Sequence, residues 1–226
     1  MKDLRNRLLA NGVRYIAIEG NIGAGKTTLS KLIAGEAGGA IFQEEVDGNP
    51  FISKFYQDTK AYAFQAQLFF LLNRYRQQTE IAQRDLFSEL IVADYLFAKD
   101  SIFANVVLED DELVLYNRLL EQLRGKIATP DLVIYLQATP EVLKKRLRKK
   151  GAAAESAISD DYLEEVARAY EHFFFHYTGS DLLIVNTSDI DFVDRNEDLQ
   201  ELLRKVSEPV RGTQYFLPLG GQAASA

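Results

Sequence analysis

The sequence predicts an α/β fold in which a five-stranded parallel sheet is covered by helices on both faces. Short runs of Val, Ile and Leu recur along the 226 residues, as expected of strands that are buried on both faces. Each run alternates with a longer segment whose apolar residues recur at helical spacing, which is typical of parallel strands joined by crossover helices. No repeat or linker divides the chain, so we expect residues 1–226 to form a single domain.

The expected elements follow one another along the chain. A short polar arm at 1–13 comes first, and small residues at the C-terminus predict a disordered tail at 218–226. The strands are expected at 15–19, 40–43, 90–93, 131–136 and 181–185. The helices are expected at 26–36, 52–83, 99–105, 110–124, 140–150, 159–177 and 195–206, with a break in the second near Asp58.

The composition excludes several classes of protein. The chain has no cysteine, which excludes disulfides and thiolate metal sites. A net charge of −7 disfavours nucleic acid as a partner, because phosphate backbones select basic surfaces. No stretch approaches the roughly 18 uninterrupted apolar residues that read as a membrane-spanning helix. We therefore expect a cytoplasmic protein that binds neither nucleic acid nor membrane.

The most specific motif is the glycine-rich loop Gly20-Asn21-Ile22-Gly23-Ala24-Gly25-Lys26-Thr27. It fits the G-x-x-x-x-G-K-[ST] pattern of a phosphate-binding P-loop, and it lies between an expected strand and an expected helix, as the motif requires. The glycines let backbone N–H groups approach phosphate, Lys26 brings a positive charge, and the Thr27 hydroxyl can ligate Mg²⁺. Residues 20–28, through Thr28, are the expected ATP site.

Acidic residues follow the next two expected strands. Glu44 and Glu45 follow the second strand, and Asp94 follows the third. Ligands of open α/β sheets bind at the carboxyl ends of the strands, so we expect these carboxylates to converge on the P-loop. One of them can accept the proton of an attacking hydroxyl, and another can help Thr27 to hold Mg²⁺.

Two further segments allow both a functional and a structural interpretation. Gln67 and Arg74 recur on one helical face with Phe70 and Leu71, where they can read the edge of a base. The spacing alone favours the other interpretation, in which the aromatics are core and the polar residues are exposed. The basic run at 144–150 is either a solvated helix end or the basic part of a lid, expected at about 144–158, that brings cations to the phosphates.

Taken together, these segments resemble the deoxynucleoside kinase family, in particular its bacterial deoxyadenosine and deoxyguanosine kinases. The resemblance spans most of the chain. It rests on the P-loop with Ile18-Glu19 before it, on Glu44-Glu45-Val46, Asn49-Pro50-Phe51 and Lys54-Phe55-Tyr56, and on Phe64-x-x-Gln67-x₆-Arg74. It continues in Asp94 through Ile102-Phe103-Ala104 and in Arg146…Glu155-x-x-Ile158…Tyr162-Leu163.

The resemblance implies transfer of the γ-phosphoryl group of ATP, with Mg²⁺, to the 5′-hydroxyl of a deoxynucleoside. By position, the resemblance makes Glu44 the catalytic base, with Lys26, Arg146 and Asp94 also in catalysis. It assigns the metal to Thr27 and Asp94, and it makes Arg146 and Lys150 the lid cations that bind ATP. The sugar 3′-hydroxyl falls to Tyr56 and Glu155, and the base to Gln67, Arg74 and Asp100. The Arg74–Asp100 pair favours an amino-bearing base, and we expect a purine.

Three positions depart from the family pattern. Glu45 stands where the family's Glu-Pro-Val motif has proline, so either glutamate can be the base. Tyr95 replaces the arginine that usually follows the third-strand acid, and Ala152 replaces the second lid arginine. Each loss removes a bidentate phosphate contact, so we expect either slower turnover or another cation, such as Arg148 or Lys149.

Two other functions remain open from the sequence. A monophosphate kinase resembling thymidylate kinase should need an arginine near the acceptor phosphate, and the missing arginine after Asp94 weighs against it. A non-catalytic P-loop regulator would need neither a base-reading pair nor a carboxylate poised as a base. The resemblance also implies a homodimer, whose interface the segments 62–75 and 110–123 can supply.

Overall fold

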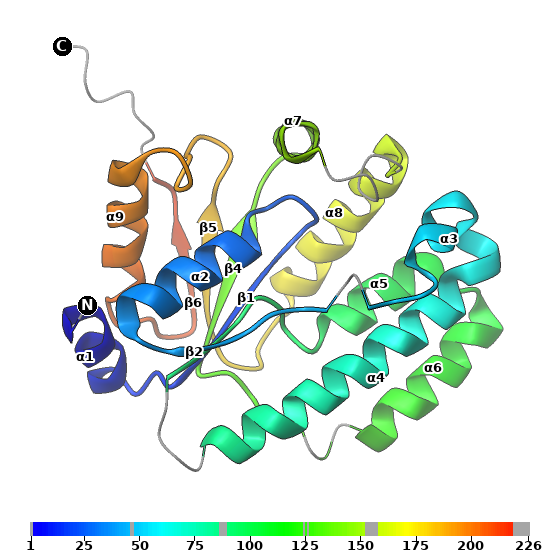
Figure 1. Cartoon of the computed structure of the whole chain (residues 1–226), viewed down its shortest axis with the longest axis horizontal. Coiled ribbons are helices and arrows are strands. Elements are labelled where there is room, and N and C mark those ends of the chain that lie inside the picture. Colours follow the sequence, from blue (N-terminus) through cyan, green and yellow to red (C-terminus); the bar gives the residue numbers. More distant parts are fainter. Residues whose placement is uncertain are drawn as a thin grey trace.

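The computed structural model describes residues 2–45, 48–85, 90–123, 125, 127–151 and 158–218. Within them, one sheet of six parallel strands in the order β2-β3-β1-β4-β5-β6 forms the centre of the molecule (Figure 1). The strands are β1 (Tyr15–Gly20), β2 (Ala40–Phe42), β3 (Ile91–Ala93), β4 (Leu132–Gln137), β5 (Asp181–Asn186) and β6 (Thr213–Phe216).

The prediction of five strands is wrong by one, because β6 extends the sheet beyond β5. Residues Thr213 and Tyr215 of β6 are exposed, whereas the residues between and after them are partly buried. An edge strand with an open face shows no continuous apolar run, so a criterion for strands buried on both faces misses it. The other strands lie where predicted, with ends that differ by one residue at most.

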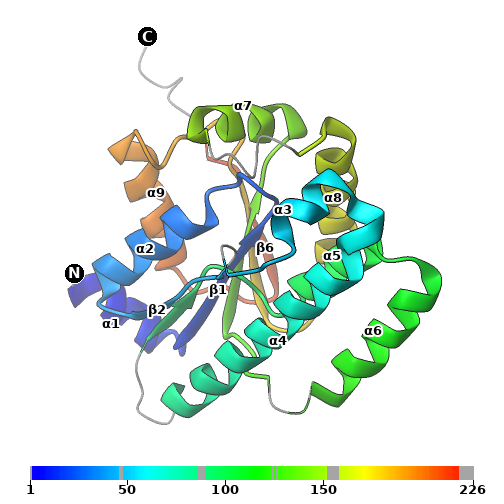
Figure 2. The ribbon, with the colours of Figure 1, turned by 45° about the vertical axis from the view of Figure 1, so that its right-hand side comes forward.

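Helices cover both faces of the sheet, as predicted. They are α1 (Lys2–Ala10), α2 (Lys26–Ala37), α3 (Ile52–Gln57), α4 (Thr59–Asp85), α5 (Lys99–Val107), α6 (Asp110–Leu123), α7 (Pro140–Lys150), α8 (Asp160–Phe175) and α9 (Asn196–Val206). One core joins the sheet to α1, α2 and α9, and the other joins it to α4, α5 and α8. Helix α6 packs outside α4 and α5, away from the sheet (Figure 2).

The residues of β1 show how one strand serves both cores. Its side chains are buried throughout, but Ile16 and Ile18 belong to the core under α2, whereas Tyr15 and Ala17 belong to the core under α4 and α8. Alternate residues of a strand point to opposite faces, so a strand covered on both sides must be apolar at nearly every position. The exception is Glu19, which is buried at the end of β1 that leads into the P-loop.

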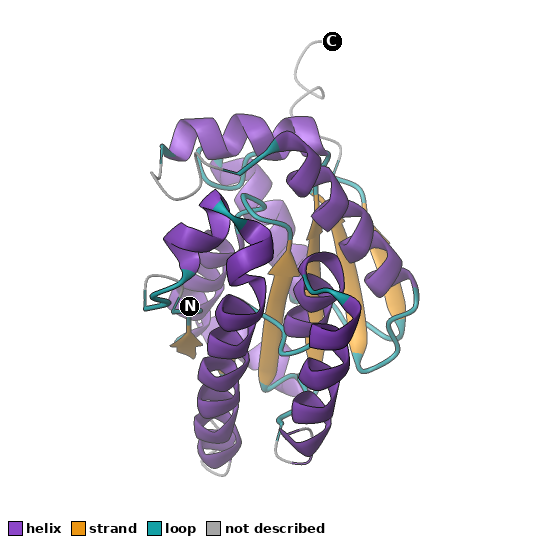
Figure 3. Ribbon diagram, turned by 90° about the vertical axis from the view of Figure 1, so that its right-hand side faces the viewer, coloured by secondary structure: helices purple, strands orange, loops and turns teal. Residues whose placement is uncertain are grey.

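Two local features lie near the end of the sheet that holds the carboxyl ends of the strands. The predicted break near Asp58 is confirmed, because Asp58 separates α3 from α4 and its side chain accepts a hydrogen bond of 3.2 Å from the N–H of Ala61. Helix α7 begins at Pro140 and ends before Gly151, and it lies across the ends of the strands (Figure 3). It includes the basic part of the predicted lid, whereas residues 152–157 and the predicted tail from 219 lie outside the described residues.

No helix in the described ranges is both long and apolar enough to span a membrane.

Candidate active site

A pocket of about 630 Å³ opens at the carboxyl ends of the central strands. This volume lies within the roughly 300–1,000 Å³ that small-molecule sites occupy. The P-loop from Ile22 to Thr28 lines one wall, and the predicted loop residues Gly20 and Asn21 are buried behind that wall. The lining also includes Glu44 after β2 and Asp94 after β3, so the predicted convergence of three strand ends is present in the structure.

The conformation of the P-loop requires glycine at two positions in particular. Gly25 has φ 99°, and a Cβ placed on it would lie 2.7 Å from Cζ of Phe192. Gly20 has φ 156°, and a Cβ there would lie 2.7 Å from the backbone oxygen of Leu136. Side chains are therefore excluded where the backbone turns, and the loop keeps the open cradle in which N–H groups can approach an anion.

Lys26 is folded onto its own loop. Its Nζ donates hydrogen bonds of 2.8 Å and 3.1 Å to the backbone oxygens of Gly20 and Asn21. Burial, together with the nearby positive charge of Lys99, lowers the pKa of Lys26 to about 8. A phosphate group in the pocket would restore a counter-charge to this ammonium, so the loop fits a polyanionic ligand.

Asp94 joins the P-loop to the end of β2. One of its oxygens accepts a 2.6 Å hydrogen bond from the Thr27 hydroxyl, and the other accepts a 2.7 Å bond from the N–H of Glu44. A hydroxyl and a carboxylate side by side, at the mouth of a phosphate loop, match the ligands of the Mg²⁺ ion that accompanies a nucleoside triphosphate. Among the described residues, no cluster of three His, Cys, Asp or Glu forms a self-sufficient metal site.

The two adjacent glutamates after β2 have different surroundings. Glu44 lines the pocket and forms ion pairs with Arg74 and with Lys99, whose Nζ lies 2.6 Å from Oε2. Burial alone would raise the pKa of Glu44, but these two cations hold it well below its usual value. Glu45 instead pairs with Arg76 at 3.1 Å, and both side chains are more than half exposed. Of the two glutamates, Glu44 is thus the one that faces the pocket, and its cations hold it ionised.

Arg74 lies between two carboxylates, Glu44 and Asp100. Its Nη1 lies 2.5 Å from Oδ1 of Asp100 in a charge contact that is not aligned as a hydrogen bond. Asp100 is fully buried and does not reach the pocket wall, so the structure brings it to Arg74 and not to the site where a base would bind. Burial raises the pKa of Asp100 to about 6, although Arg74 opposes that shift.

Gln67 and Arg74 are only 3% and 4% exposed, so the interpretation that their spacing favoured, with both exposed, is wrong. Both line the pocket, and the guanidinium of Arg74 lies 5.1 Å from the ring centre of Phe70. Within the described chain, Oε1 of Gln67 and Nε of Arg74 have no hydrogen-bond partner. Buried polar atoms without a partner are rare, and these two belong to side chains that line the cavity, which indicates a polar ligand at this end.

The remaining pocket lining at this end is largely aromatic. Phe70 and Phe103 lie here with Phe55, Tyr56 and Tyr162, and the five residues come from four different helices. Flat apolar walls with an amide and a guanidinium at one edge suit a heterocyclic base. Tyr56 therefore lies in the pocket as predicted, whereas its predicted partner Glu155 lies outside the described residues.

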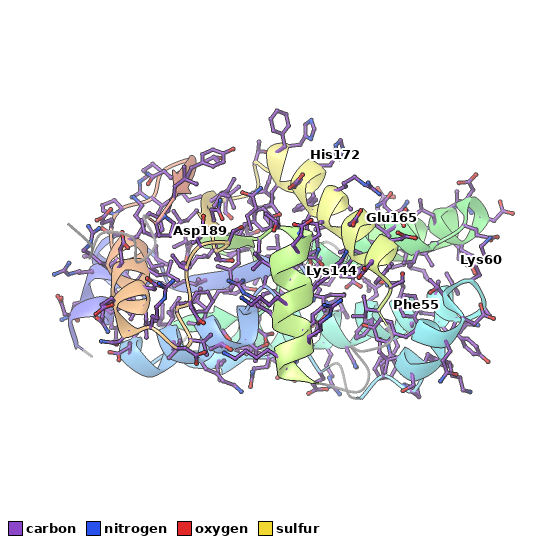
Figure 4. The ribbon with its side chains drawn as sticks, turned by 90° about the horizontal axis from the view of Figure 1, so that it is seen from above. Phe55, Lys60, Lys144, Glu165, His172 and Asp189 are labelled. Atoms are coloured by element: carbon purple, nitrogen blue, oxygen red, sulfur yellow. The ribbon has the colours of Figure 1, made fainter. Side chains whose placement is uncertain are left out.

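The opposite end of the pocket is formed by α7 and the loop that follows β5. Arg146 donates to the backbone oxygens of Thr187 and Ile190, at 2.5 Å and 3.2 Å, and so fixes α7 to this loop. Lys149 and Lys150 also line the pocket, and Lys149 pairs with Asp194. Figure 4 shows α7 between the loop that carries Asp189 and helix α8, which carries Glu165. The basic run thus faces the pocket in part and is no simple solvated helix end.

Comparison with known proteins places this geometry in one family. The family model for deoxynucleoside kinases matches residues 16–211. The chain belongs to the deoxynucleoside kinase family.

Relatives in the deoxynucleoside kinase family match nearly their whole length. The chain is 33% identical over 203 residues to the deoxyguanosine kinase of Bacillus subtilis (strain 168), an alignment that covers 88% of this chain and 98% of the relative. It is 30% identical over 210 residues to the deoxyadenosine kinase of Lactobacillus acidophilus, covering 88% and 97%. A solved structure of deoxyadenosine kinase from M. mycoides with bound dATP is similar with a TM-score of 0.73 at 26% identity, covering 85% of this chain and 98% of that chain.

One site residue of this deoxynucleoside kinase went unrecognised in the sequence. Lys99 lines the pocket beside Glu44, whereas the cations expected to compensate for the missing arginines were Arg148 and Lys149. Arg148 is exposed and does not line the pocket. The one available signal was a lysine inside an otherwise apolar stretch directly before Asp100. The loop from Ile190 to Val193 also lines the pocket, and no motif marks it.

Proposed function

We propose that this protein transfers the γ-phosphoryl group of ATP to the 5′-hydroxyl of a deoxynucleoside, with a preference for purines. The observation that carries the proposal is the joining, in one pocket, of a phosphate loop, an ionised carboxylate and two polar side chains, Gln67 and Arg74, that can bind the edge of a base. All of these parts line one cavity of about 630 Å³, a volume typical of small-molecule sites. Relatives named deoxyguanosine kinase and deoxyadenosine kinase support the choice of purines.

Glu44 is the proposed proton acceptor. It takes the proton of the 5′-hydroxyl as that oxygen forms a bond to the γ-phosphorus, while the bond to the bridging oxygen of ADP breaks. A carboxylate needs to be ionised and within reach of the hydroxyl to do this, and the cations beside Glu44 hold it ionised. Glu45 is turned toward Arg76 at the surface, which supports Glu44 as the base.

The P-loop side is proposed to hold the triphosphate. Backbone N–H groups of the loop and the ammonium of Lys26 bind the phosphates, and Thr27 and Asp94 hold the Mg²⁺ ion. That ion, when bound, neutralises charge on the phosphate oxygens. Arg146, Lys149 and Lys150 enclose the pocket from α7, where they exclude water and bring further positive charge to the nucleotide.

The other end is proposed to hold the deoxynucleoside. Gln67 and Arg74 bind the edge of the base, with Asp100 orienting Arg74 from behind, and the aromatic residues of the wall pack on its faces. Tyr56 and Glu155 are proposed to bind the 3′-hydroxyl of the sugar. A purine with an amino or keto group offers both a donor and an acceptor to an amide.

A panel assay tests the proposal. The protein is mixed with ATP, Mg²⁺ and, in turn, each of the four common deoxynucleosides, the matching ribonucleosides and thymidine monophosphate, and the products are identified by mass. We expect 5′-monophosphates of deoxyadenosine or deoxyguanosine, and roughly 10²- to 10⁴-fold slower formation of them with Glu44→Gln. Phosphorylation of thymidine monophosphate alone would indicate a monophosphate kinase, and ATP binding without any product would indicate a regulator.

We further propose that residues 1–226 act as a single cytoplasmic domain that binds small molecules only and forms a homodimer. Leu72 of α4 and Val114 and Leu115 of α6 are large apolar side chains that are about half exposed, at 54%, 53% and 49%. Helices α4 and α6 pack against each other, so these side chains can contribute to one interface. Leu115→Glu should shift the mass measured by light scattering from that of a dimer to that of a monomer, whereas an unchanged dimer would exclude this face.

A further inference from the structure

Two physical effects, the helix dipole and burial, disfavour a lysine at position 99. It is the first residue of α5, where the helix dipole repels a positive charge, and its side chain is only 8% exposed. Removing an ammonium from water is costly unless a counter-charge is fixed nearby. Residues that break local rules in this way are found mainly at functional sites.

The counter-charge for Lys99 is Glu44. The Nζ of Lys99 donates a 2.6 Å hydrogen bond to Oε2 of Glu44, while Arg74 binds Oε1 of the same carboxylate. Each oxygen of the proposed base therefore has one cation, and the two cations come from different helices. The charged groups around this carboxylate are Lys26 of the P-loop, Asp94 after β3, Arg74 of α4, and Lys99 and Asp100 of α5.

The backbone that carries Lys99 is held in place from the sheet. The buried carboxylate of Glu19 accepts a 2.8 Å hydrogen bond from the N–H of Leu96 and a 2.9 Å bond from the Tyr170 hydroxyl. The N–H of Lys99 in turn donates a 2.9 Å bond to the oxygen of Leu96. These hydrogen bonds hold the turn between β3 and α5 in place at Leu96, just before α5 begins. They therefore fix the position of Lys99 relative to Glu44.

The usual arginine after the third-strand acid has no equivalent at its own position. Tyr95 stands there, and its side chain is fully buried in the core under α4 and α8. Lys99 lies four residues further along the chain, but it lines the same pocket as Asp94, Glu44 and Lys26. It is therefore in a position to supply the charge that the arginine would have supplied.

We propose that Lys99 is a positioning residue for phosphoryl transfer, which holds the Glu44 carboxylate in the orientation that accepts the 5′-hydroxyl proton. This inference rests on the proposed function. Without Lys99, Glu44 would be held by Arg74 alone, on the side away from Lys99, and Arg74 is shared with Asp100. The proton would then have no fixed acceptor at the moment when the 5′-oxygen attacks.

A double-mutant cycle with Glu44 tests this role. We compare the wild type, Lys99→Met, Glu44→Gln and the double variant, with Lys99→Arg as the conservative variant and Lys60→Met as a matched surface control. Lys60 is 90% exposed at the rim of the molecule (Figure 4). The same proteins are measured for kcat, for KM of ATP and of the deoxynucleoside, and for thermal unfolding.

We expect Lys99→Met to lower kcat about 100-fold while KM for ATP changes less than about threefold, because general-base catalysis supplies roughly 10²- to 10⁴-fold. Lys99→Arg should retain activity within about tenfold, since it keeps the charge. In the Glu44→Gln background, Lys99→Met should lower kcat less than about threefold, since the carboxylate that it positions is gone. Lys60→Met should match the wild type.

Multiplicative losses in the double variant would overturn the proposal, because Lys99 would then act independently of Glu44. A kcat for Lys99→Met equal to that of the wild type would overturn it as well. Thermal unfolding measures the pair without activity, and the double variant should unfold at a higher temperature than the sum of the two single shifts predicts. If that coupling is present and the wild type phosphorylates nothing in the panel, the proposed function fails while the Lys99–Glu44 pair stands.

Discussion

The Thr27 hydroxyl and the Asp94 carboxylate lie 2.6 Å apart, which joins the first turn of α2 to the end of β3. The contact crosses from the phosphate loop to the neighbouring strand of the sheet, and Asp94 also accepts the N–H of Glu44 at 2.7 Å. One carboxylate therefore sets the distance between the proposed metal site and the proposed catalytic base. This arrangement explains why an acid, rather than an amide, is suited to position 94.

Replacing the Thr27 hydroxyl should weaken the use of metal specifically. Thr27→Val keeps the shape of the side chain but removes a metal ligand and leaves one oxygen of Asp94 without its donor. We expect the Mg²⁺ concentration for half-maximal activity to rise about 10- to 100-fold, the range seen when groups around a metal are lost. Thr27→Ser keeps the hydroxyl and should stay close to the wild type. Equal metal requirements in the two variants would contradict the assignment.

Substitution of Gly25 should damage both stability and ATP binding. Gly25→Ala places a side chain at φ 99° and against Phe192 of the loop that follows β5. We expect the free energy of unfolding to fall by about 1–3 kcal/mol. Gly35 of α2 is the control, because no atom lies within 4 Å of a Cβ placed there, so Gly35→Ala should stabilise the helix by about 0.5–1 kcal/mol. Opposite signs for two Gly→Ala changes ten residues apart are a sharp test by urea unfolding.

Two glutamines of α4 should respond in opposite ways to replacement by leucine. Gln67 lines the pocket and its Oε1 has no partner among the described residues, so Gln67→Leu should leave stability equal or higher and raise KM for the deoxynucleoside about 10- to 100-fold. Gln77 donates a 2.9 Å bond to the oxygen of Gln43, so Gln77→Leu should lower the free energy of unfolding by about 1–3 kcal/mol with KM unchanged. A loss of stability in Gln67→Leu with normal KM would reduce Gln67 to a core residue.

The parts of the site that the sequence predicts are those fixed by local pattern and by chain topology. The P-loop is a contiguous motif, and Glu44 and Asp94 follow strands whose ends must meet in a parallel sheet. The choice between Glu44 and Glu45 was not predictable, because adjacent residues after a strand point in different directions and only the partners show which way. Those partners, Lys99 for Glu44 and Arg76 for Glu45, lie 55 and 31 positions away along the chain.

The spacing of residues along the chain also did not predict which polar side chains are buried. Gln67 and Arg74 are polar, and most such residues are exposed, so the pattern favoured the surface. Arg74 is buried with two carboxylate partners, Glu44 after β2 and Asp100 of α5, which no local pattern reveals. Lys99 was missed for the same reason. Strand β6 was missed because an edge strand needs no continuous apolar run.

The buried carboxyl of Asp100 should give the protein an unusual dependence of stability on pH. Its pKa is about 6 in the folded protein, above the ordinary 3.8 that it has when the chain is unfolded. Between these values the folded state holds the proton and the unfolded state does not, so this group lowers stability as pH rises from about 4 to about 6. Asp100→Asn has no proton to lose. The free energy of unfolding of the wild type, relative to this variant, should fall by up to about 3 kcal/mol across that interval and stay level above it, at about 1.4 kcal/mol per pKa unit.

Urea unfolding of both proteins at half-unit steps from pH 4.5 to pH 7 measures this difference directly. Taking the difference between two proteins cancels the titration of the other carboxylates, which both share. Asp111→Asn, at the exposed start of α6, shows what the removal of a surface carboxylate does by itself. Parallel curves for the wild type and Asp100→Asn would mean that Arg74 holds Asp100 ionised throughout. A falling difference would mean that burial outweighs the ion pair, and that Arg74 loses a counter-charge below about pH 6, where binding of the base should weaken with it.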